Sequence, residues 1–184
     1  QLTATALTAT GNTIVLSSSE SDITIGQAST GDAGSITLTA TVGTISHDGI
    51  QNGSLATASL SVTAGHNIDL TTDVQTAELN TTGAGYVTLQ EHDGIVITNM
   101  VTANGPISVT SGGQVTAHIV DASQTDLFTN TITVLANDGI DVGEIHTGPT
   151  ASVTLTSSNG PVAHDDDVAI DVTTGTLTTT AASN

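Results

Sequence analysis

The chain has 184 residues, of which 18 are Asp or Glu and none is Lys or Arg, so its formal net charge is −18. This balance excludes nucleic acid and the surface of an anionic membrane as expected partners, because binding to either depends largely on basic side chains. The length allows one domain or a short repeat array. Tyr86 and Phe128 are the two aromatic residues, whereas a compact sandwich or helical domain usually buries several large rings.

Residues 1–34 are expected to form the first coil of a repeat array. Leu2, Ala4 and Ala6 alternate with polar residues, which is the period of a β-strand with one buried face. Ile14 and the residues that follow it supply further apolar positions for the same coil.

The clearest strand pattern lies at 35–45. Ile36 and Leu38 alternate with threonines, Gly43 is a turn residue, and Ile45 begins the apolar face again. The same order of an apolar–polar–apolar triplet, a glycine and a further apolar residue recurs along the chain. Copies of it lie at 87–95, 132–140 and 153–162, with looser versions at 7–14, 60–68 and 107–115 and a weak one from residue 177.

The recurrence predicts a repeat architecture. We take seven apolar positions as equivalent, at spacings of 20 to 31 residues: Leu7, Leu38, Val62, Leu89, Val109, Val134 and Leu155. A period in this range is typical of a solenoid. The prediction is one β-solenoid, a parallel β-helix without α-helices, over residues 1–184. Its seven or so coils begin near residues 1, 35, 59, 85, 105, 131 and 152, with a partial coil from 175.

The alternative fold is a jelly-roll or β-sandwich filament subunit. In that alternative residues 1–10 form a donor strand that completes the sheet of a neighbouring subunit. Neither end of the chain has an obvious polar cap, which solenoids need to keep their last coil from pairing with another chain. Both folds therefore predict strand edges through which copies associate.

Copies such as 35–40 (Ser-Ile-Thr-Leu-Thr-Ala) and 152–156 (Ser-Val-Thr-Leu-Thr), each with its trailing glycine, resemble the β-helical repeats of filamentous-haemagglutinin-like adhesins and of giant repeat-rich bacterial surface proteins. The chain departs from that pattern in its uneven repeat length and in its lack of Lys and Arg. The resemblance implies an extracellular, fibrous, right-handed β-helix with an adhesive or structural role. It carries over no site residues.

Acidic turns are the candidate metal ligands. Turns of the type His-Asp-Gly or Asn-Asp-Gly recur at 47–49, 92–94 and 137–139, and residues 164–167 read His-Asp-Asp-Asp. Asp and Gly are ordinary turn formers, so a purely structural role is the first interpretation. The functional interpretation is a Ca²⁺ site, because this ion accepts several carboxylate oxygens. The best candidate ligands are Asp165, Asp166, Asp167 and Asp171.

Threonine pairs are expected on the outer surface. Thr37 with Thr39, Ser61 with Thr63, Ser108 with Thr110 and Thr154 with Thr156 would share one outward face. Strand propensity and contacts between hydroxyls on neighbouring strands explain such pairs. An ice-binding face is the alternative interpretation, which Gln90 and Leu135 interrupt.

The expected function is structural. Lyases built on β-helices use a basic residue that is missing here, and carbohydrate clefts normally present aromatic platforms, so we expect no enzyme. The chain is interpreted as a repeat segment or subunit of an extracellular filament, sheath or adhesin stalk at the cell surface. It would associate end to end with itself, or with neighbouring repeats of a longer chain. The alternatives are an adhesive module for a host or cell-surface receptor or glycan, and a pilin-like subunit linked by donor strands.

Overall fold

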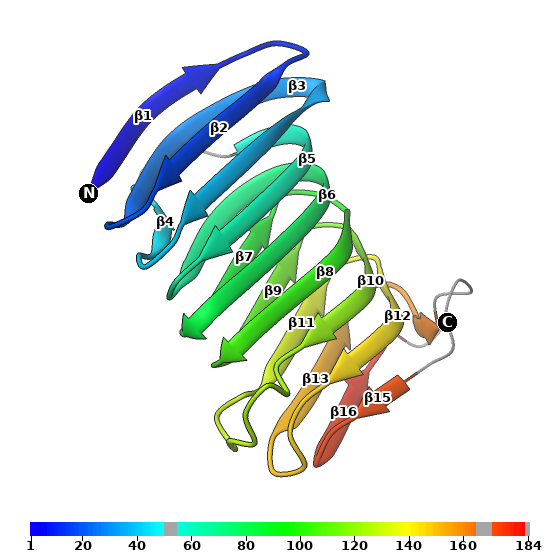
Figure 1. Ribbon diagram of the computed structural model, residues 1–184. Helices are drawn as coiled ribbons and strands as arrows, with labels where there is room; N and C mark the ends of the chain where they lie inside the picture. Colours follow the sequence, from blue (N-terminus) through cyan, green and yellow to red (C-terminus); the bar gives the residue numbers. More distant parts are fainter. Residues whose placement is uncertain (50–54, 165–170, 183–184) are drawn as a thin grey trace.

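The computed structural model describes residues 1–49, 55–164 and 171–182, which form a stack of parallel β-strands (Figure 1). Within these residues there is no helix, and every strand pair is parallel. The strands are β1 (Leu2–Thr8), β2 (Thr13–Ser18), β3 (Ile23–Ala40), β4 (Ile45–His47), β5 (Leu55–Ala64), β6 (Ile68–Ala84), β7 (Val87–Glu91), β8 (Ile95–Asn104), β9 (Ile107–Ser111), β10 (Gln114–Asp121), β11 (Ile132–Ala136), β12 (Gly139–His146), β13 (Ser152–Ser157), β14 (Val162–His164), β15 (Asp171–Thr173) and β16 (Thr176–Thr180).

The strands wind into a β-solenoid of about eight turns, which confirms the predicted fold class and sets aside the sandwich alternative. Each turn contributes one strand to each of two faces. Face A contains β1, the first part of β3, β4, the first part of β6, β7, β9, β11, β13 and β16. Face B contains β2, the rest of β3, β5, the rest of β6, β8, β10, β12, β14 and β15. β3 and β6 are long because they run across a corner from one face to the other.

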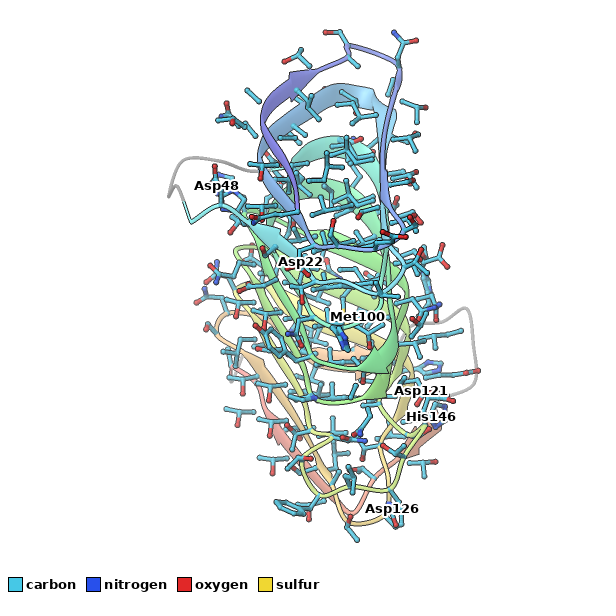
Figure 2. All side chains as sticks on the ribbon, turned by 60° about the vertical axis from the view of Figure 1, so that its left-hand side comes forward. Asp22, Asp48, Met100, Asp121, Asp126 and His146 are labelled. Carbon is cyan, nitrogen blue, oxygen red and sulfur yellow. The ribbon has the colours of Figure 1, made fainter. Side chains whose placement is uncertain are left out.

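The core is a thin stack of aliphatic side chains between the two faces. In β7 and β9 the buried residues alternate with outward polar ones, as the period of two requires, and in β11 the outward residues are Thr133 and Leu135. A face A column consists of Leu2, Ile23, Ile45, Ile68, Val87, Ile107, Ile132, Val153 and Leu177. A face B column consists of Leu16, Leu38, Val62, Leu79, Met100, Val120, Ile145 and Val172. Figure 2 shows Met100 inside the coil and the labelled aspartates at its periphery.

The predicted equivalence of seven apolar positions is wrong in one respect. Leu38 and Val62 lie in the face B column, whereas Leu89, Val109, Val134 and Leu155 stack on one another on face A. The same triplet pattern occurs on both faces, and nothing in the triplet marks the face to which it belongs. The predicted common face for the threonine pairs fails for the same reason. Thr37, Thr39, Ser61 and Thr63 are on face B, and the pairs at 108–110 and 154–156 are on face A.

Glycine is required where successive turns approach closely. Gly112 passes so near the carbonyl oxygen of His92 that a Cβ atom would overlap it, and Gly160 has the same relation to Asp138. Both are the glycine that trails an apolar triplet. The glycine in the repeat therefore serves close packing between turns as well as chain reversal. Within the described residues, no helix is long and apolar enough to cross a membrane.

Candidate functional site

The predicted Ca²⁺ ligands are only partly placed. Asp165, Asp166 and Asp167 lie outside the described residues. Asp171 begins β15, where its backbone pairs with that of Glu144 in β12.

A different acidic cluster forms at a corner between the two faces. Within the described residues, oxygen atoms of Asp73, Glu91 and Asp93 lie within 4.8 Å of one another. Stacking brings them together, because β6 and β7 are neighbouring layers in which Thr72 pairs with Glu91. Asp73 follows Thr72 in β6, and Asp93 lies in the turn after β7. Residues separated by 20 positions thereby meet on one corner.

Glu91 is the buried member of this cluster, with only 5% of its surface exposed. The side chains of Val87, Leu89 and Glu91 are the three inward ones of β7, and Glu91 is the last of them. Its Oε2 accepts a hydrogen bond of 2.7 Å from the Thr72 hydroxyl. Its Oε1 accepts backbone N–H groups of Val74 at 3.2 Å and His92 at 2.9 Å. Burial raises the pKa of Glu91 above its ordinary value, and these hydrogen bonds oppose that rise.

The equivalent residues of later turns show what this position does for the fold. Ser111 and Ser157 stand in register with Glu91 in the layers of β9 and β13. The hydroxyl of Ser111 accepts the N–H of Gly113 at 3.2 Å, and that of Ser157 accepts the N–H of Gly160 at 3.1 Å. An inward polar side chain therefore satisfies backbone N–H groups at this corner in several turns. Glu91 does so with a carboxylate.

A cavity of about 370 Å³ opens beside the cluster. Asp32, Asp73 and Asp93 are among its lining residues, so three turns contribute acidic residues to it. Asp73 and Asp93 are exposed, and with Glu91 they form the group that could hold a metal ion. Hard oxygen ligands of this kind suit Ca²⁺. Both oxygens of Glu91 accept hydrogen bonds, whereas Asp73 and Asp93 are exposed to solvent.

The turn motif at 92–94 identifies Asp93 but neither of the other two members of the cluster. The signal for Glu91 is a charged residue at an inward position of an alternating strand. Such a residue is costly to bury unless it is hydrogen-bonded, as it is here. No local sequence pattern identifies Asp73 as a member of the cluster, because Glu91 and Asp93 belong to the next turn.

A braced loop at residues 122–131 joins β10 to β11 and exposes apolar side chains. Phe128 is 74% exposed and Leu127 is 42% exposed. The buried Asn130 holds the loop by donating to the carbonyl and hydroxyl oxygens of Thr125 at 2.8 and 2.9 Å. Asp126 in turn accepts a hydrogen bond of 3.0 Å from Thr150 of the next turn. The apolar tip is a candidate contact surface for the adhesive alternative.

The ends of the stack present open strand edges. Among the described strands, β1 and β2 pair only with β3, while β16 pairs only with β13, and β14 and β15 pair only with β12. The inward residues at these ends are less buried than those in the middle. Leu177 is 48% exposed, whereas Leu89 is fully buried. Figure 1 shows β1 at one end of the stack and β16 near the other.

Comparison with protein-family models, with curated proteins and with solved structures finds no match to this chain.

Proposed function

We propose that the chain is a structural protein, a repeat segment or subunit of an extracellular filament, sheath or adhesin stalk. The observation that carries the proposal is the pair of open parallel edges at opposite ends of one solenoid. An unpaired edge is a template for another strand. Because the two ends differ, contact between them is head to tail, which generates an open filament rather than a closed dimer.

The sequence supports the same proposal. The apolar–threonine repeats resemble those of filamentous-haemagglutinin-like adhesins and giant bacterial surface proteins, and the resemblance implies an extracellular, fibrous protein with an adhesive or structural role. The architecture suits a structural role. The aliphatic column is continuous along the rod, and each turn is hydrogen-bonded to the next. A formal charge of −18 disfavours binding to nucleic acid or to an anionic membrane, since both depend largely on basic side chains.

A proline at the open edge of β1 tests this function. The N–H of Leu2 donates to Asp22 of the next layer at 2.8 Å, so the N–H of the following residue, Thr3, points to the open edge. Thr3→Pro removes that donor without removing a bond to β3. We expect the unsubstituted chain to form rods in electron micrographs and the Thr3→Pro chain to stay monomeric.

Thr3→Ala is the matched control, since it removes the same side chain and keeps the N–H. It should assemble like the unsubstituted chain, and far-ultraviolet circular dichroism should show the same strand content for all three. A chain that stays monomeric at every salt concentration, or a Thr3→Pro variant that assembles normally, would overturn the proposal.

A further inference from the structure

One hydrogen bond repeats along the face A column and defines a register for the junction between copies. In each of six successive layers the column residue donates its N–H to the residue that precedes the next column residue, over 2.8–3.0 Å. Leu2 donates to Asp22, Ile23 to Thr44, Ile45 to Asn67, Ile68 to Tyr86, Val87 to Pro106 and Ile107 to Thr131. The bond therefore always runs from one layer to the next in chain order.

At the last layer the same donor faces the open edge. The N–H of Thr176 points back to β13, where it donates to the carbonyl of Ala151 at 3.2 Å. Successive N–H groups of a strand point to opposite edges, so the N–H of Leu177 points away from β13. At the first layer the matching acceptor is the carbonyl of Gln1, which precedes Leu2. The two ends thus carry the two halves of the repeating bond.

We infer that copies join by pairing β16 of one with β1 of the next, in the register that places Leu177 over Leu2. This inference rests on the proposed function and specifies its junction. The N–H of Leu177 donates to the carbonyl of Gln1 of the next copy, and the column from Leu2 to Leu177 continues across the junction. The half-exposed Leu177 side chain then gains the layer that covers every other column residue.

The number of layers limits the junction to face A. The described strands form nine layers on face A, from β1 to β16, and eight on face B, from β2 to β15. When β1 of the next copy lies against β16, its β2 is separated from β15 by one strand position. A single pair of short strands therefore holds each junction, which makes the junction weak and reversible.

Engineered cysteines test the register, because the native chain has no cysteine. Thr178 and Thr3 face outward beside Leu177 and Leu2 and would lie opposite each other. Neighbouring strands are about 4.8 Å apart, which is within disulfide reach. The two residues stand at opposite ends of one rod about 38 Å long, so a disulfide between them can only join two copies. Mild oxidation of the Thr3→Cys, Thr178→Cys chain should give a ladder of covalent oligomers.

The control moves one cysteine by two residues on the same face. In the Thr5→Cys, Thr178→Cys chain the partners are about 8 Å apart in the inferred register, which is beyond disulfide reach. This chain should assemble and give at least tenfold less covalent oligomer. Rods that form while only the control pair crosslinks, or neither does, would overturn the register and leave the proposed function standing. If no rods form, both fail.

Discussion

At the scale of single residues, Glu91 combines a structural role with a titratable group. Its carboxylate accepts hydrogen bonds from the N–H groups of Val74 and His92 and from the hydroxyl of Thr72, although the side chain is almost completely buried. Burial raises the pKa of Glu91, and its hydrogen bonds to Thr72, Val74 and His92 oppose that rise. The neighbouring His92 is on the turn that follows β7.

The raised pKa of Glu91 predicts a dependence of stability on pH. The folded chain holds the Glu91 proton more tightly than the unfolded chain, whose reference pKa is 4.5. The contribution of this group is therefore complete below pH 4.5 and is lost as the pH rises through the folded pKa. We expect the free energy of unfolding to rise on acidification from pH 7 toward pH 4.5 more in the native chain than in Glu91→Gln.

Urea unfolding of the two chains at several pH values measures this difference. Acid also relieves repulsion among the remaining carboxylates, but that effect is common to both chains and cancels in the comparison. Parallel curves for the native chain and Glu91→Gln would contradict a raised pKa at this position.

At the scale of the repeat element, the trailing glycine links neighbouring turns. Gly160 follows β13 and packs against the carbonyl of Asp138 in the turn after β11. The N–H of the same glycine donates to the Ser157 hydroxyl. The backbone of one turn is thus in direct contact with the backbone of the turn before it, with no room for a side chain between them.

Gly160→Ala should destabilise the solenoid by about 1–3 kcal/mol, the usual cost of forcing extra volume into a packed site. The loss is expected in thermal or urea unfolding. Ser158→Ala is the control, because Ser158 is exposed in the same loop and its substitution should change the free energy of unfolding by less than about 0.5 kcal/mol. Equal effects of the two substitutions would show that the close approach at Gly160 is unimportant.

At the scale of the whole molecule, the rod carries a high line charge. Eight turns at about 4.8 Å give a length of about 38 Å, so a charge of −18 amounts to about one charge per 2 Å. Duplex DNA carries about one charge per 1.7 Å and condenses counterions. When two such rods join end to end, their mutual repulsion must be screened by counterions.

Assembly should therefore increase steeply with salt. The Debye length falls from about 30 Å at 0.01 M to about 10 Å at 0.1 M ionic strength, which screens repulsion between neighbouring rods. Light scattering should rise over this range, and millimolar Mg²⁺ or Ca²⁺ should act at far lower concentrations than NaCl. The Thr3→Pro chain should not respond, which separates edge assembly from salting out. Scattering that is independent of ionic strength would contradict the account.

Much of the architecture could be predicted from local patterns. Ile36 with Leu38 and Val153 with Leu155 alternate with threonine, and this alternation by itself indicates strands with one buried face. The spacing of the copies predicts a solenoid, and the small number of rings agrees with its thin aliphatic core. The candidate site could not be predicted to the same extent. Glu91 meets Asp73 only because β6 and β7 lie in adjacent layers.

The amino-acid sequence alone determined the strand period, the aliphatic content of the core and the absence of basic groups, since these depend on residue type and on near neighbours. Only the tertiary structure decided that Leu38 belongs to one face and Leu89 to the other, and that carboxylates from different turns share one corner. The physical reason is that a period of two specifies inside and outside along a strand. It does not specify which strand lies above it, because that depends on the path of the chain around each turn.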